Sequence, residues 1–141
     1  MWIARNYMLF LLFALLAVAC DKGGCNVIPN VTFHQTFSQA TAAEAFRPNG
    51  SDYISGGVSG LIVHNISNAA GAYKFVAYDR CSPVNPEQRN QVVITNAFYA
   101  EDPVSGAKWF LKDGSPIDVA ECPLKPYYVS SFGNSYTVGN N

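Results

Sequence analysis

The most reactive side chains of this chain belong to four cysteines and two histidines: Cys20, Cys25, Cys81, Cys122, His34 and His64. Thiolates and imidazoles bind soft metals, and thiolates also attack electrophiles and form disulfides. Cys81 lies in the stretch VAYDRCSPVNP, where a strand-like run enters a loop bounded by prolines. This setting leaves four interpretations open for Cys81: a metal ligand, a nucleophile, one half of a disulfide, or no chemical role.

The other candidate groups do not assemble into a catalytic pattern. His34 and His64 each lie in strand-like sequence without a second ligand at metal-site spacing, so they are interpreted as surface or half-buried residues. Glu101 and Asp102 are adjacent, and adjacent strand residues point to opposite faces, which favours a solvated pair. Ser105 precedes a glycine but lacks the surrounding G-x-S-x-G elbow. No catalytic residue is therefore assigned.

Composition and charge narrow the class of protein. A chain of 141 residues fits one domain and can bury a workable core without metal or disulfides. Nine Lys and Arg residues stand against ten Asp and Glu residues, and neither sign is clustered. Nucleic-acid backbones require a basic patch, so we expect no nucleic-acid partner.

The N-terminus, MWIARNYMLFLLFALLAVAC, is organised as a secretion signal. Arg5 supplies the positive charge, and residues 7–16 form an apolar run that ends in small residues and is short for a bilayer span. The final AVAC places Cys20 directly after small residues, which resembles the lipobox of bacterial lipoproteins. Leucine is more usual than Ala17 at the first position of that motif, and Leu16 stands one place earlier.

The lipobox resemblance implies a signal peptide over residues 1–19 and an acylated Cys20. Two or three acyl chains, each contributing ~0.8 kcal/mol per buried methylene, would hold the protein on a membrane. Residues 20–26 would form a short tether and residues 27–141 the domain, anchored at the membrane and facing the periplasm or the cell surface. That compartment permits disulfides. Ordinary secretion and an uncleaved anchor stay open as alternatives, and so does the choice between inner and outer membrane.

The rest of the chain has the alternation of short strands and turns that is typical of an all-β protein. Short runs of β-branched and aromatic residues alternate with turn signals, and only SQATAAEAF, barely two turns long, has helical composition. SGLIVHNIS and YKFVAYDR, separated by the turn-rich NAAGA, predict a hairpin. The remaining predicted strands are NVTFHQTF, QVVITNAFY, AKWFL, YYVSSF and SYTVG. Seven or eight short strands at this spacing favour a sandwich or barrel.

Two loops of this pattern resemble a known family. The first is YDRCSPVNP and the second is EDPVSGAKWFLKDGSPI, and each lies at a junction between strands. In the second loop Pro103, Gly106, Trp109 and the Asp113-Gly114 turn match the framework of a Rieske [2Fe–2S] domain. PLKPYYVS is similar to that family's closing proline loop and last strands. From about Val27 onward, the chain resembles the Rieske-like domains of some bacterial membrane lipoproteins.

The resemblance implies an antiparallel Rieske-like β sandwich or barrel with two site loops and a proline loop. It also implies four ligand positions, two for thiolates and two for imidazoles, and these are Cys81, Pro83, Asp102 and Ser105 in this sequence. Only Cys81 keeps a ligand side chain of the family, because proline has no donor atom and serine is a poor substitute. We therefore expect no cofactor and no bound metal.

The family's geometry also carries an expectation for the cysteines. Its proline loop folds over the cluster loops, and here that loop contains Cys122 directly before Pro123. The resemblance therefore implies a disulfide between Cys81 and Cys122 in place of the lost metal, with two free, half-buried cysteines as the alternative. Cys25, on the tether, could pair with either partner or with another molecule.

The resulting hypothesis is a membrane-anchored lipoprotein whose degenerate Rieske-like domain acts as a binding or accessory module. Its expected partners are the membrane, through Cys20, and a protein that the sequence does not identify. Two alternatives stay open: an electron-transfer protein that binds [2Fe–2S] through another ligand set, and an enzyme that uses the old cluster cleft.

Overall fold

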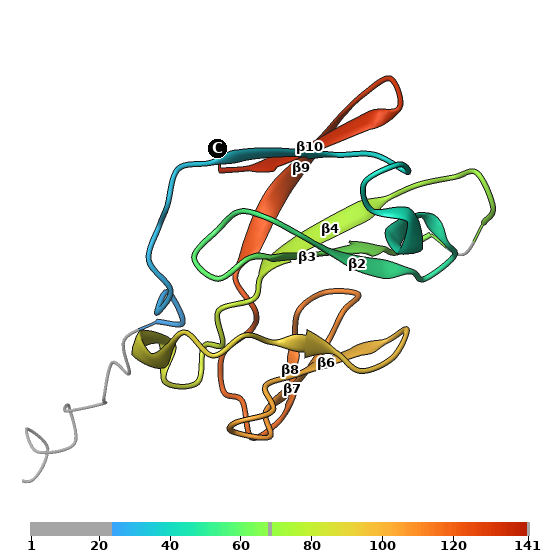
Figure 1. The fold of residues 1–141 in the computed structure, drawn as a ribbon. Helices are drawn as coiled ribbons and strands as arrows, with labels where there is room; N and C mark the ends of the chain where they lie inside the picture. Colours follow the sequence, from blue (N-terminus) through green and yellow to red (C-terminus); the bar gives the residue numbers. More distant parts are fainter. Residues whose placement is uncertain (1–23, 68, 141) are drawn as a thin grey trace, which may run out of the picture.

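The computed structural model describes residues 24–67 and 69–140, so Cys20 and the predicted signal peptide lie outside the described residues. Ten strands and two short 3-10 helices are formed in this part of the chain (Figure 1). They are β1 (His34–Phe37), η2 (Ala43–Phe46), β2 (Ser51–Ile54), β3 (Leu61–Asn65), β4 (Phe75–Asp79), η3 (Pro86–Gln88), β5 (Val93–Ile94), β6 (Tyr99–Glu101), β7 (Lys108–Phe110), β8 (Pro116–Asp118), β9 (Pro126–Phe132) and β10 (Ser135–Gly139).

The strands form two antiparallel sheets. The larger sheet has the order β1-β10-β9-β4-β3-β2, and the smaller has the order β5-β6-β7-β8. The whole smaller sheet is inserted between β4 and β9, which are neighbours in the larger one. Figure 1 shows the smaller sheet, in gold and orange, below the larger sheet. The predicted all-β, antiparallel fold is confirmed.

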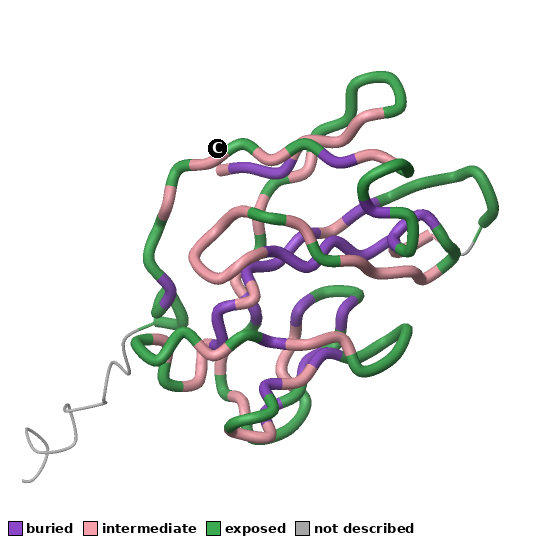
Figure 2. The backbone as a smooth tube through the Cα atoms, viewed as in Figure 1, coloured by how far each residue is buried: buried purple, intermediate pink, exposed green. Residues whose placement is uncertain are grey.

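Each sheet has its own buried cluster of apolar side chains. Phe37, Leu61 and Val63 belong to the cluster of the larger sheet, whereas Trp109 and Leu111 belong to that of the smaller sheet. All five residues of β3 are buried, and Figure 2 shows that burial concentrates on β3 and β4. Ile62 of β3 joins the smaller sheet's cluster while its neighbours join the other, because successive strand residues point to opposite faces. β3 therefore holds the two cores together.

Three details differ from the sequence prediction. QVVITNAFY is not one strand but a hairpin of β5 and β6, because the side chain of Asn96 accepts hydrogen bonds from the N–H groups of Phe98 and Tyr99 and closes a turn. The strands β2 and β8 were not predicted, because each is short and partly polar. The helix-like SQATAAEAF forms only the 3-10 helix η2, with Ala45 and Phe46 buried.

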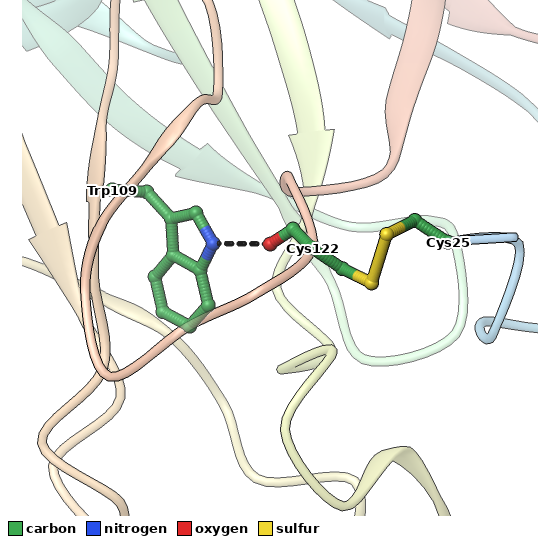
Figure 3. Close-up of a disulfide and its surroundings, with 3 residues drawn as sticks. All are labelled: Cys25, Trp109 and Cys122. Atoms are coloured by element: carbon green, nitrogen blue, oxygen red, sulfur yellow. Dashed lines mark hydrogen bonds between the residues drawn. A yellow bond between two sulfur atoms is a disulfide. The ribbon is translucent and has the colours of Figure 1, made fainter. Parts of the chain in front are cut away.

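The predicted Cys81–Cys122 disulfide is wrong. Cys122 is bonded to Cys25, with their Cα atoms 5.3 Å apart, and Cys81 is a free, buried thiol (Figure 3). The physical reason is that residues 25–30 pack against the proline loop, where Lys125 Nζ donates to the carbonyl oxygen of Ile28 at 3.0 Å. That packing brings Cys25, not Cys81, to Cys122. Within the described ranges, no helix has the length and apolar character needed to cross a membrane.

Candidate functional site at the two loops

The first loop leaves β4 and keeps Cys81 inside the protein. The Ser82 N–H donates to the carbonyl oxygen of Asn90 at 2.9 Å, so residues 82–90 form a closed loop that carries η3. Cys81 is fully buried, and its thiol donates to the carbonyl oxygen of Pro86 at 3.5 Å. Burial raises the pKa of the Cys81 thiol, and the nearby Asp79 carboxylate acts in the same direction. A thiol held in the protonated form is a weak nucleophile and a weak metal ligand.

The second loop is a tight polar turn between β6 and β7, built around Asp102. The Asp102 carboxylate accepts a hydrogen bond from the Val104 N–H at 2.9 Å and another from the Ser105 hydroxyl at 2.8 Å. The Gly106 N–H donates to the Asp102 carbonyl oxygen at 2.8 Å, and Gly106 has a φ of 78°, a conformation that favours glycine. Asp102 is fully buried, so its interpretation as half of a solvated pair was wrong.

The first loop also influences the Asp102 carboxyl. The side chain of Ser82, which is fully buried, acts to lower the pKa of Asp102. Burial alone would raise the pKa of Asp102, but the effect of Ser82 and the hydrogen bonds from Ser105 and the Val104 N–H outweigh burial and hold this pKa below its ordinary value. The carboxylate is therefore ionised at neutral pH, and its oxygen atoms accept hydrogen bonds from the protein itself.

The four family ligand positions can now be compared with what a [2Fe–2S] cluster requires. Cys81 is a buried thiol, and Pro83 is a half-exposed loop residue. The Ser105 hydroxyl donates a hydrogen bond to the Asp102 carboxylate. A cluster needs thiolate or imidazole donors, and these residues do not supply them. Among the described residues, no three His, Cys, Asp or Glu side chains are grouped so that they could hold a metal ion. The donor set does not fit the cluster.

Sequence reasoning missed Asp79, the last residue of β4. Its carboxylate is fully buried and accepts hydrogen bonds from the N–H groups of Val58 at 2.6 Å, Ser59 at 3.1 Å and Cys81 at 2.8 Å, and from the hydroxyl of Tyr127 at 2.7 Å. This one carboxylate fastens the 55–60 turn, the first loop and β9 to one another. The sequence signal was an acidic residue ending the apolar run FVAYD, directly before the loop.

The proline loop is fixed from two sides. On one side the Trp109 indole N–H, from the core of the smaller sheet, donates to the Cys122 carbonyl oxygen at 2.9 Å (Figure 3). On the other side the Cys25–Cys122 disulfide ties the loop to the start of the domain. The loop thus holds together the smaller sheet and the N-terminal segment, a role that the family resemblance did not specify.

The Asp102 geometry predicts a pH-dependent contribution to stability. We expect Asp102→Asn to lower the free energy of unfolding by about 2 kcal/mol at pH 7, because the amide cannot accept from every donor around it. The pKa of Asp102 is lower in the folded state than the ordinary value of about 3.9, so the carboxylate stabilises fully above about pH 5 and less as the pH falls through the folded value. The difference from the parent protein should shrink in acid.

Urea unfolding at a series of pH values measures this difference. Asp118→Asn, at an exposed carboxylate of β8, is the matched control and should change stability by less than about 0.5 kcal/mol. An Asp102→Asn effect that is absent, or that is the same at pH 3 and pH 7, would contradict the assignment.

Comparison with known proteins gives little that bears on function. No family model matches the chain, and no curated protein matches it. A solved structure from Mycobacterium tuberculosis, described as an NADH-dependent nitrite reductase small subunit, is similar in fold at 14% sequence identity and a TM-score of 0.44. The match covers 79% of this chain and 98% of that one.

Proposed function

We propose that this protein is a membrane-anchored lipoprotein whose Rieske-like domain has lost its cluster and serves as a binding or accessory module. The observation that carries the proposal is the buried Asp102 carboxylate, which accepts hydrogen bonds from Val104 and Ser105 of its own turn. Asp102 and Ser105 stand at two of the four positions that the resemblance gives to cluster ligands. A loop that would hold a cluster in the family is closed here by hydrogen bonds to a buried carboxylate.

The arrangement of the loops supports this reading over a redox function. Cys81 has a buried thiol of raised pKa, and the other three positions offer no soft donor. Both loops lie at strand junctions, and the Trp109 indole N–H donates to the Cys122 carbonyl oxygen of the proline loop, an arrangement that agrees with the proposed Rieske-like framework. A Rieske-like framework that lacks the cluster-ligating side chains is what we expect of a protein that uses the fold as a scaffold.

We expect the purified protein to be colourless and to contain no stoichiometric iron or sulfide. The reason is the absence of thiolate and imidazole donors at Pro83, Asp102 and Ser105. Metal analysis, acid-labile sulfide analysis and visible absorption measure this on protein expressed with an active iron–sulfur assembly system. Brown protein with two irons per chain would establish the alternative, an electron-transfer protein that binds [2Fe–2S] through another ligand set.

The anchoring part of the proposal rests on the AVAC sequence before Cys20. We expect the parent chain to fractionate with membranes and Cys20→Ser to be released or to accumulate as an unprocessed precursor, because serine cannot form the thioether to a diacylglycerol. Cell fractionation and the mass of the mature chain measure both. Cys81→Ala is the control, since it removes a cysteine outside the disulfide and should leave fractionation unchanged. If Cys20→Ser fractionates and migrates like the parent, the lipoprotein assignment is wrong.

A further inference from the structure

A cavity lies away from the two loops, between the larger sheet and the β5–β6 hairpin. Its volume is about 440 Å³, within the range of roughly 300 to 1,000 Å³ typical of small-molecule sites. In Figure 1 the turn of the β5–β6 hairpin points to the side opposite η3. The residues that matter in its wall are Asn49, His64, Phe98, Tyr99, Phe110 and Lys112.

Three aromatic side chains in this wall are exposed. Phe98 is 57% exposed, Phe110 40% and Tyr99 37%. The ring centroids of Tyr99 and Phe110 are 5.4 Å apart, and those of Phe98 and Tyr99 are 6.4 Å apart. The Asn96 side chain holds the turn that carries Phe98, accepting from its N–H at 2.8 Å. The aromatic wall is therefore formed before any ligand arrives.

Polar groups share the cavity with these rings. The His64 ring is buried, and its Nδ1 lies 2.7 Å from the Ser51 hydroxyl oxygen, which fixes the ring in the cavity wall. Asn49 has a left-handed backbone with φ of 54°, a turn conformation that asparagine adopts more readily than most residues, and its side chain adds an amide to the wall.

Lys112 supplies a positive charge to this wall, and it takes part in no ion pair within the part of the chain that the structure describes. The neighbouring Asp113 carboxylate accepts from the Ser115 hydroxyl at 2.6 Å and from the Ser115 N–H at 3.0 Å. These bonds engage Asp113 in its own turn, while Lys112 stays available at the cavity.

We propose that this cavity binds a small planar anion, namely an aromatic ring system that carries a carboxylate. The flat apolar part would lie against Phe98, Tyr99 and Phe110, which gain from contact with another ring. The carboxylate would pair with Lys112, and the Asn49 amide and His64 ring would supply hydrogen bonds. This site depends only on the fold, so it holds or fails independently of the lipid anchor and of the empty ligand set at the loops.

The test is an NMR titration of the isotope-labelled protein with two probes, 1-naphthoate and the neutral 1-naphthalenemethanol. We expect saturable shifts at residues around the cavity, with tighter binding of the acid. Phe98→Ala should weaken both probes about tenfold through lost apolar contact, whereas Lys112→Gln should weaken only the naphthoate, also by about tenfold. Both side chains are exposed, so both variants should keep the parent's thermal unfolding curve.

Lys108→Gln is the matched control, because Lys108 is exposed on β7 of the same sheet but does not line the cavity. It should leave both affinities unchanged. The proposal is overturned if the shifts do not saturate, if they centre elsewhere on the molecule, or if Lys108→Gln weakens naphthoate binding as much as Lys112→Gln does.

Discussion

Replacing Cys122 with serine should lower the free energy of unfolding by about 4 to 5 kcal/mol, the chain-entropy value for a loop of this length. The Cys25–Cys122 bond closes a sequence separation of 97 residues, nearly the whole described domain, so its loss frees the unfolded chain considerably. Domains of this size have a total stability of roughly 5 to 15 kcal/mol, and the variant should therefore be close to unfolding at 37 °C. Urea unfolding of oxidised parent and variant measures the loss.

The other cysteines make the experiment decisive. Cys25→Ser should cost as much as Cys122→Ser, and the double variant should cost no more than either, because all three lack the same bond. Cys81→Ala should cost about 1 kcal/mol or less, as expected for a small buried thiol outside the bond, and should leave the Cys25–Cys122 peptide pair intact in unreduced digests. A large loss for Cys81→Ala with a small one for Cys25→Ser would restore the Cys81–Cys122 pairing.

Removing the Asp79 carboxylate should have a similarly large effect. Asp79→Ala leaves three backbone N–H groups and the Tyr127 hydroxyl without their acceptor in a buried region. Each unsatisfied buried donor costs about 1 to 3 kcal/mol, so we expect at least ~4 kcal/mol and little folded protein at 37 °C. Hydrogen exchange should be fastest in the 55–60 turn and the first loop.

Two milder variants keep this prediction measurable. Tyr127→Phe removes one donor but leaves the acceptor and the backbone contacts, and should cost about 1 kcal/mol. Asp79→Asn keeps one acceptor oxygen and should fall between Tyr127→Phe and Asp79→Ala. The structural role would be refuted by an Asp79→Ala protein as stable as Tyr127→Phe, or by exchange rates in residues 55–60 that match the parent.

The elements that sequence reasoning found are those whose information is local. The β3–β4 hairpin was predicted because LIVHN and FVAYD are rich in apolar and β-branched residues and a turn-rich segment separates them. The β9–β10 hairpin was predicted in the same way, with Gly133 at a φ of 59° in its turn. By contrast, the β5–β6 turn was not predicted, because Phe98 is apolar and the turn depends on a single side chain, that of Asn96.

The sequence predicted only part of the candidate site, for a different reason. Cys81 and Pro83 follow β4, and Asp102 and Ser105 lie between β6 and β7, so both pairs stand at the strand junctions that the sequence pattern indicated. Their equivalence to the ligand positions of the Rieske family stays a prediction. The Cys25–Cys122 pairing depends on how the N-terminal segment folds back over the proline loop, and no local pattern encodes that packing. The cavity wall that contains Phe98 was not predicted for the same reason, since this cavity forms between two sheets.

The Cys25–Cys122 bond also decides how mechanical force would pass through the molecule. Consider a pull between the N-terminal side, where a membrane anchor at Cys20 would act, and a point C-terminal to β9. The force reaches Cys25 and crosses the S–S bond to Cys122. Residues 26–121 then lie in a covalently closed loop that bears no tension, so β1, an edge strand beside β10, would not be peeled off. The load falls on β9, which lies between β10 and β4. With the bond reduced, the same pull would open the larger sheet from β1 inward.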